Sequence, residues 1–160
     1  VDLFLIETVS AIDQVRAALA GAKGHGRPIW LGVSVDDRDG RKLRSGEPLE
    51  KVMDWTDDMD ALLVNCATPE AVSVAVDVVK GTDKPFGAYA NGFRQITKEF
   101  LKDSPTVDSL EARPEMTPAR YADFAMRWGN ADARPRPGSS GSRKPDTEAR
   151  SSLASSASFR

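Results

Sequence analysis

The chain has 160 residues, of which 40% are hydrophobic and 29% charged, a balance typical of one globular domain with an apolar core. Its 22 basic and 24 acidic residues give a net charge of −2, which offers no general attraction for nucleic acid or anionic lipid, and its single cysteine excludes an intramolecular disulfide. Without an apolar run of roughly 18 residues or a recognisable signal peptide, we expect a cytoplasmic protein with neither membrane nor nucleic-acid partners.

Four short apolar runs predict β-strands, and they lie at Leu3–Ile6, Ile29–Val35, Ala61–Val64 and Phe86–Tyr89. Apolar residues are continuous within these runs rather than alternating, which is typical of strands buried on both faces of a parallel sheet. The first run begins almost at residue 1, without the polar lead-in of most termini, so we expect the chain to be part of a larger fold.

Helix signals lie between and after these strands. Ser10 is predicted to cap a first helix that ends at Gly21, and Glu47-Pro48 is predicted to open a second, shorter one. Two stronger signals combine a threonine cap with proline at the first helical position, and they lie at Thr68-Pro69 and Thr117-Pro118.

The predicted order is therefore β-α-β-α-β-α-β, then a long loop and a last helix. Strands that start about 25 to 32 residues apart suit right-handed βαβ crossovers. Two α/β architectures remain open at this point, an open doubly wound sheet or part of a (β/α)8 barrel. A complete barrel typically needs about 250 residues, so this chain could hold only around half of one.

The composition changes near residue 133 and divides the chain into residues 1–133 and 134–160. The second segment is rich in Ser, Arg and Pro and has Leu153 and Phe159 as its only large apolar residues. Such a segment cannot bury enough apolar surface to offset the entropy of ordering, so we predict a disordered C-terminal tail.

Candidate site residues lie where the predicted strands end, because parallel α/β folds bind ligands at the carboxyl ends of their strands. Cys66 follows the third strand and precedes a helix, which leaves three readings open: an inert buried thiol, a nucleophile or a zinc ligand. The only histidine, His25, is expected at the opposite end of the sheet, which argues against a Cys–His pair. Glu7 is either a rim carboxylate or a clamp for an amino group, and Asn91 either a turn residue or a ligand contact.

Several of these motifs, in this order, resemble the homocysteine S-methyltransferase (homocysteine-binding) domain family. The resemblance covers about residues 1–130 and rests on Val1-Asp2, Glu7-Thr8, Pro28-Ile29-Trp30, Ser34, Leu43, Gly46, Val64-Asn65-Cys66, Tyr89-Ala90-Asn91, Tyr121 and Trp128. It implies a partial (β/α)8 TIM barrel in which the four predicted strands correspond to about strands 4 to 7.

The resemblance also implies a function and a set of site residues. The activity would be zinc-dependent methyl transfer, from an onium or folate donor to the homocysteine thiolate, giving methionine. Cys66 would be a zinc ligand. Four further residues would bind substrate, with Glu7 on the homocysteine amino group, and they are Glu7, Thr8, Asn65 and Asn91.

The sequence departs from the family pattern in places that bear on zinc. The family's other two zinc cysteines stand in a Gly-Gly-Cys-Cys run, whereas this chain has Arg-Pro-Arg-Pro-Gly-Ser-Ser-Gly over residues 134–141. Two of the three expected zinc thiolates are thus missing, Ala90 replaces a usual proline, and the family's first three strands are absent. A reading-frame shift in the gene would explain the abrupt tail, a hypothesis that the DNA sequence tests.

Two alternatives to an active methyltransferase follow from the same residues. One is a non-catalytic truncated remnant of the family, consistent with a single cysteine and half a barrel. The other is a small α/β ligand-binding domain with a cleft near Glu7 and Asn91. A complete small domain should melt sharply without a partner chain, whereas a remnant with two open sheet edges should be poorly stable as a monomer.

Overall fold

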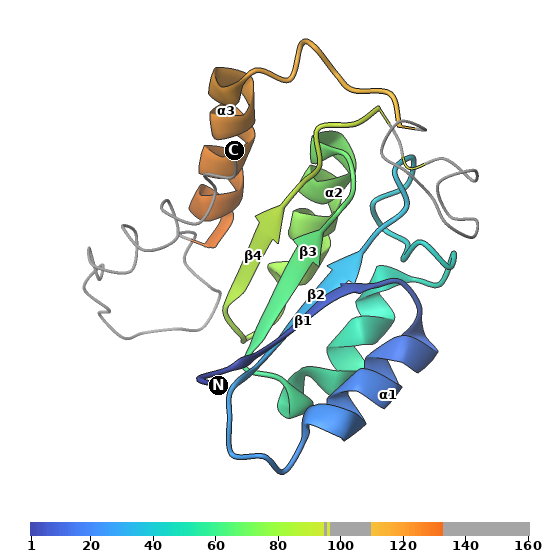
Figure 1. Cartoon of the computed structure of the whole chain (residues 1–160), viewed down its shortest axis with the longest axis vertical. Helices are drawn as coiled ribbons and strands as arrows, with labels where there is room; N and C mark the ends of the chain where they lie inside the picture. Colours follow the sequence, from blue (N-terminus) through green and yellow to red (C-terminus); the bar gives the residue numbers. More distant parts are fainter. Residues whose placement is uncertain (95, 97–109, 133–160) are drawn as a thin grey trace.

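The computed structural model describes residues 1–94, 96 and 110–132, and in this part of the chain strands alternate with helices (Figure 1). The elements in chain order are β1 (Phe4–Val9), α1 (Ile12–Ala22), β2 (Ile29–Ser34), the 3-10 helix η1 (Leu49–Asp58), β3 (Ala61–Asn65), α2 (Pro69–Val79), β4 (Phe86–Tyr89) and α3 (Pro118–Asp132). None of these helices is long and apolar enough to cross a membrane. The tail predicted over residues 134–160 lies outside the described residues.

The four strands form one parallel sheet in the order β1-β2-β3-β4. This order confirms the α/β class and the alternation predicted from the sequence. The described residues leave the sheet open, with β1 and β4 at its edges, so they do not close a barrel. Sequential parallel strands with a helical crossover between neighbours are the repeating unit of a (β/α)8 barrel.

The first strand differs from its predicted bounds, which ended at Ile6. It continues to Val9, which pairs with Val33, and the register shifts between Ile6 and Val9. Thr8 lies in this irregularity with a φ of 59°. The polar pair Glu7-Thr8 looked like the end of a strand, but it lies inside one because the bulge lets pairing resume.

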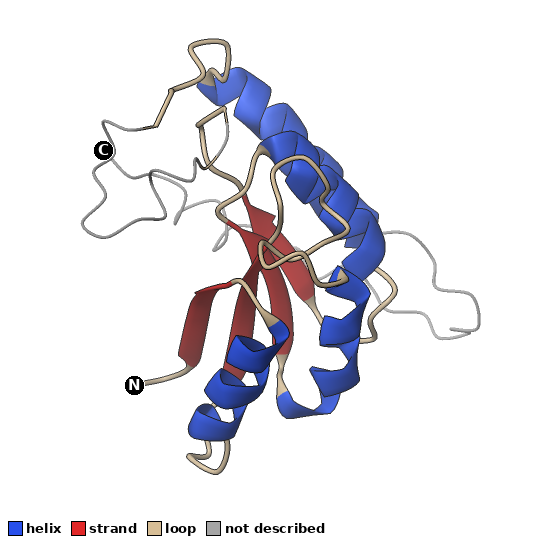
Figure 2. Ribbon diagram, turned by 90° about the vertical axis from the view of Figure 1, so that its right-hand side faces the viewer, coloured by secondary structure: helices blue, strands red, loops and turns tan. Residues whose placement is uncertain are grey.

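The described helices all pack on one face of the sheet (Figure 2). Right-handed crossovers that all proceed in the same direction across a sheet place every helix on the same side. On that side the central strands bury Leu31, Val33, Leu62 and Val64, each fully inaccessible to solvent. The opposite face, whose exposed Leu5 is aligned with Trp30, has no helix against it in the described residues.

Two of the helix-start predictions differ in outcome. Thr68 caps α2 as predicted, since its hydroxyl accepts from the Ala71 N–H at 3.4 Å and Pro69 is the first helical residue. The predicted cap at Ser10 is wrong, because Ala11 occupies the N-cap of α1 and offers no side-chain acceptor. The Ile12 N–H instead donates to Glu47 Oε2 at 3.0 Å. A carboxylate that is distant in sequence thus accepts the hydrogen bond that an N-cap side chain would otherwise accept.

The last helix is held by aromatic side chains. Trp128 is buried, and its indole N–H donates to Ser73 Oγ on α2 at 3.0 Å. Tyr121 packs edge-on against Trp128 and accepts at its hydroxyl from the Ala90 N–H at 3.0 Å. These contacts fix α3 beside β4 and α2, close to the carboxyl end of the sheet (Figure 1).

Candidate functional site

The residues predicted to form a site do meet at the carboxyl ends of the strands. Glu7 and Thr8 lie in the last part of β1, Asn65 is the last residue of β3, and Cys66 follows it. Asn91 comes two residues after β4 ends. Strands β1 and β3 are separated by β2, so side chains must reach across it to touch, and the contacts below show how they do.

A tyrosine joins the outer strands of the sheet. The Tyr89 hydroxyl, from β4, donates to Glu7 Oε1 on β1 at 2.7 Å and lies 3.0 Å from the Asn65 amide. Burial and then the hydrogen bond to the Glu7 carboxylate raise the pKa of Tyr89 well above its ordinary value. The hydroxyl is therefore protonated, and a donor, throughout the neutral range.

Asn65 continues the polar chain towards the thiol. Its buried amide lies 3.2 Å from Thr8 Oγ1, and Thr8 Oγ1 lies 3.5 Å from Cys66 Sγ. With its nitrogen and oxygen exchanged, the amide donates to the Val33 carbonyl at 3.2 Å and accepts from the Thr8 N–H at 3.3 Å. In both orientations the amide is hydrogen-bonded, so Asn65 ties β1 to β3 beneath Cys66.

Thr8 and Cys66 share an unusual backbone conformation. Their φ angles are 59° and 54°, in the left-handed region that side chains other than glycine seldom adopt. For a β-branched threonine this conformation is a true outlier, and such strain concentrates at functional sites. Thr8 lies in β1 and Cys66 directly follows β3, and the two residues touch each other through Oγ1 and Sγ.

The backbone of Cys66 is held at each polar atom. Its N–H donates to the Tyr89 carbonyl at 3.2 Å. Its carbonyl accepts from Arg44 Nη2 at 3.0 Å and from Asn91 Nδ2 at 3.1 Å. Asn91 was predicted to contact the substrate, but one of its two amide N–H groups donates to the Cys66 carbonyl. In this structure Asn91 therefore fixes the segment that carries the thiol.

Sequence reasoning missed Arg44 and Asp37, which form a shielded ion pair behind Cys66. Arg44 Nη1 lies 3.3 Å from Asp37 Oδ2, and the two side chains are only 13% and 5% exposed. Asp37 also accepts from the Thr68 N–H at 2.8 Å and from the Ile96 N–H at 2.6 Å. The sequence around Asp37 and Arg44 carries no signal that Arg44 turns back towards Cys66.

His25 lies at the far end of the sheet, as expected. Its ring packs edge-on against Phe4, at the start of β1, with the ring centroids 5.8 Å apart. Cys66 follows the carboxyl end of β3, so the two side chains are at opposite ends of the strands. A Cys–His catalytic pair is thereby ruled out for this chain.

The donor set around Cys66 does not complete a zinc site. Zinc in proteins takes three or four protein ligands, and this chain has one cysteine. Among residues 1–94, 96 and 110–132, no three His, Cys, Asp or Glu side chains lie close enough together to hold a metal ion. Cys66 can therefore supply one ligand, but the described residues do not fit the rest of the site.

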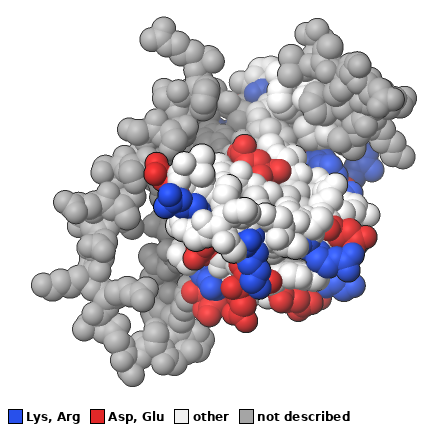
Figure 3. Space-filling view, turned by 60° about the horizontal axis from the view of Figure 1, so that its bottom comes forward, with Lys and Arg blue, Asp and Glu red and all other residues white. Residues whose placement is uncertain are grey.

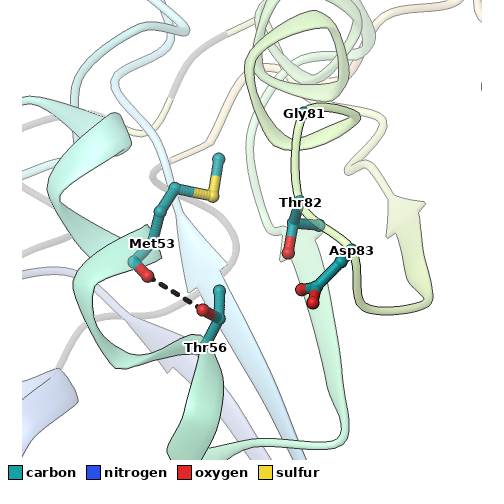
Figure 4. A pocket seen from close by; sticks show the side chains of 5 residues that line it. All are labelled: Met53, Thr56, Gly81, Thr82 and Asp83. Carbon is teal, nitrogen blue, oxygen red and sulfur yellow. Dashed lines mark hydrogen bonds between the residues drawn. The ribbon is translucent and has the colours of Figure 1, made fainter. Parts of the chain in front are cut away.

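A separate cleft opens between η1 and the turn after α2 (Figure 4). It has a volume of about 390 Å³ and is lined by Met53, Thr56, Gly81, Thr82 and Asp83. These residues precede β3 and β4, so the cleft lies at the amino end of the sheet, away from Cys66. Figure 3 shows one side of the molecule, on which the acidic and basic side chains of the described residues are interspersed. No patch of a single charge sign is visible among them on that side.

Comparisons with known proteins agree with the resemblance seen in the sequence. A family model described as Homocysteine S-methyltransferase matches residues 1–136, which confirms that resemblance. A search of curated proteins gave no match.

The fold is similar to three solved structures of the homocysteine methyltransferase MmuM from Escherichia coli. Their apo, oxidised and metallated forms match with TM-scores of 0.59, 0.57 and 0.59, each at 22% sequence identity over 83% of this chain. The matched part is 42%, 39% and 38% of the respective MmuM chains. This chain therefore spans about two fifths of the length of the solved structures that it matches.

Proposed function

Because the chain belongs to the homocysteine S-methyltransferase family, we propose that the residues at the carboxyl ends of β1 and β3 bind homocysteine as a methyl acceptor. The reaction of the whole protein is methyl transfer from an onium or folate donor to the homocysteine sulfur, giving methionine. The observation that carries the proposal is the linked set of contacts that brings Glu7, Asn65, Thr8 and Cys66 together.

Glu7 has the chemistry to bind the ammonium group of an amino acid. It is exposed at the end of the sheet, and its Oε1 accepts from the Tyr89 hydroxyl. In the described part of the chain no residue donates to Oε2, which leaves that oxygen for a ligand. Hydrogen bonds between an ammonium and a carboxylate are charge-assisted and about twice as strong as neutral ones.

Cys66 is the residue that we propose as a zinc ligand, since the family is zinc-dependent. Bound zinc would supply the means of keeping the homocysteine sulfur as a thiolate at neutral pH. The two cysteines that would complete the family's site are absent from this chain, so we assign Cys66 no catalytic step. Its backbone contacts with Arg44 and Asn91 fix where the thiol stands beside Thr8.

The proposal is tested by calorimetric titration of the full chain with L-homocysteine and with 4-mercaptobutyrate, which lacks only the amino group. We expect L-homocysteine to bind at least about tenfold more tightly, because a hydrogen bond to a charged group contributes about 1.5 to 3 kcal/mol. Glu7→Gln should abolish this preference. Glu50→Gln, which changes an exposed glutamate at the start of η1, is the matched control and should keep it. Equal binding of the two compounds by the unaltered chain would contradict the proposal.

A second candidate is a family member that binds the amino acid without performing methyl transfer, and the single cysteine favours it. Zinc titration separates the two. A tight 1:1 complex that Cys66→Ser abolishes would favour the enzyme, because Cys66 would then belong to a completed site. Weak binding that Cys66→Ser leaves unchanged would favour the non-catalytic reading.

A further inference from the structure

Tyr89 reaches from one edge of the sheet to the other. It is the last residue of β4, whereas Glu7 belongs to β1, and two strands lie between them. The side chain crosses the face that no described helix covers, and its hydroxyl ends 2.7 Å from Glu7 Oε1. A contact between the outer strands of a four-stranded sheet requires that the strands between them leave room.

Gly32 provides that room on β2. A Cβ atom at this position would stand 3.3 Å from the Tyr89 hydroxyl oxygen, 3.1 Å from the Ile6 carbonyl oxygen and 3.5 Å from Asn65 Nδ2. The first two distances are shorter than ordinary carbon contacts, so a side chain would press on the hydroxyl. Glycine is therefore needed at position 32 to leave space for the Tyr89 side chain, and not because its backbone adopts a positive φ.

Tyr89 also contacts the other half of the proposed site through its backbone. Its carbonyl accepts from the Cys66 N–H at 3.2 Å. One residue therefore holds both the carboxylate proposed to bind the ammonium group and the segment that carries the thiol.

The Tyr89 hydroxyl donates its hydrogen bond to Glu7 rather than to the Asn65 amide. Both Glu7 Oε1 and the Asn65 amide lie within hydrogen-bond distance, at 2.7 and 3.0 Å. The carboxylate is charged and nearer, so it is the stronger acceptor whichever way the amide is turned.

We propose that Tyr89 is a positioning residue that holds Glu7 through Oε1 and so presents Oε2 to the ammonium group of the amino-acid ligand. This inference rests on the proposed function, since it assumes that Glu7 binds that group. Tyr89 acts through Glu7 and does not itself touch the ligand.

The test is Tyr89→Phe in the full chain, with Tyr121→Phe as the matched control. Both variants remove a half-buried tyrosine hydroxyl, but Tyr121 bonds to the Ala90 backbone and not to Glu7. We expect Tyr89→Phe to weaken L-homocysteine binding roughly tenfold. The affinity for 4-mercaptobutyrate should stay unchanged, because that compound makes no ammonium contact. If Tyr89 had a purely structural role, Tyr89→Phe would weaken the binding of both compounds alike.

A second measurement keeps this inference separate from the proposed function. In chain labelled with ¹³C at tyrosine Cζ, Glu7→Gln should shift the Tyr89 signal at neutral pH and leave the Tyr121 signal in place. If that shift appears but homocysteine does not bind, the contact stands and the proposed function fails. If homocysteine binding depends on Glu7 but Tyr89→Phe matches Tyr121→Phe, the proposed function stands and the positioning role is overturned. An unmoved Tyr89 signal also overturns it.

Discussion

At the scale of single residues, backbone strain marks the point where the two halves of the proposed site touch. Thr8 and Cys66 adopt left-handed backbone angles, and their side chains are in contact. Such conformations persist only when the surroundings impose them. For Cys66 the surroundings are visible, because Tyr89, Arg44 and Asn91 bind both of its backbone polar groups.

This strain predicts an unusual order of stability for two substitutions at Cys66. The Cys66→Gly variant should be more stable than Cys66→Ala by roughly 0.5 to 1 kcal/mol, because only glycine adopts a positive φ without cost. Neither variant has a thiol, so the comparison isolates the backbone. Urea denaturation measures the free energies of unfolding, and an alanine variant as stable as the glycine variant would show that the backbone is not strained.

The shielded ion pair behind Cys66 predicts that Asp37 is far more sensitive than its neighbour. Asp37→Asn leaves Arg44 without its charged partner in a nearly buried position, so we expect a loss of about 3 kcal/mol in the free energy of unfolding. Asp36→Asn is the matched control. Asp36 accepts from two backbone N–H groups in a turn that asparagine also supports. Denaturant unfolding of both variants checks this, and equal losses would contradict it.

The sequence predicted only those residues of the candidate site that lie at the ends of strands. Glu7, Asn65 and Cys66 stand at or just after apolar runs, and parallel strands bring such positions to one edge of the sheet. Tyr89 crosses the whole sheet and Arg44 turns back from a loop, and no local pattern encodes either path. Both depend on tertiary contacts between segments that are far apart in sequence.

At the scale of elements, Arg113 ties the chain that precedes α3 to the start of α2. Its guanidinium makes two hydrogen bonds to Glu70, at 2.6 and 2.9 Å, and a third to Glu115 at 2.9 Å. Arg113 is largely buried, whereas both carboxylates are about half exposed. The hydrogen bonds from Arg113 hold the pKa of Glu70 and of Glu115 below the usual value.

This arrangement predicts an acid-sensitive anchor. A carboxyl group whose pKa is lowered by folding stabilises the folded state above its unfolded pKa of 4.5, and that contribution fades as the pH falls through the lower folded value. Arg113→Gln should therefore destabilise the protein at pH 7, and the difference from the unaltered chain should shrink below pH 4.5.

Denaturant unfolding at pH 7 and pH 3 measures that difference. The control is Arg127→Gln, since Arg127 lies over the Phe124 ring and has no carboxylate partner among the described residues. Its effect should be the same at both pH values. An Arg113→Gln effect that is equally constant would show that the two carboxylates do not anchor the segment.

The elements themselves were largely predictable, with exceptions that have physical causes. Thr68-Pro69 combines a cap with a residue that suits the first helical position, and α2 begins there. Ser10 carries only the first of these signals, and Glu47 satisfies the start of α1 from a distance. The extension of β1 to Val9 depends on a bulge, which the apolar run Leu3–Ile6 does not encode.

At the scale of the whole molecule, the described sheet has one covered face and two open edges. Parallel sheets are almost always covered on both faces, and unpaired edges invite pairing with another chain. Leu5 lies on the uncovered face of the edge strand β1 and is 48% exposed. Chain length left an open sheet and part of a barrel as alternatives, and the family resemblance favoured the partial barrel; the described strands match about 40% of MmuM and remain an open sheet.

This open face predicts concentration-dependent self-association of the chain. Leu5→Lys should reduce it, because a charged side chain on an edge strand opposes pairing. Met126→Lys, which changes another exposed apolar residue, on α3, is the control and should leave association unchanged. Sedimentation velocity over a concentration series measures the effect. A chain that is monomeric at every concentration, or equal effects of the two substitutions, would contradict the prediction.

The homocysteine site proposed for this chain lies at the strand ends around Glu7 and Cys66. The most direct measurement is an NMR titration of the ¹⁵N-labelled full chain with L-homocysteine, following the backbone amides. We predict that the signals of Glu7, Thr8, Asn65, Cys66 and Asn91 shift together with a single dissociation constant. Shifts confined to the opposite cleft, at Met53 and Thr82, or no shifts at all, would contradict the claim.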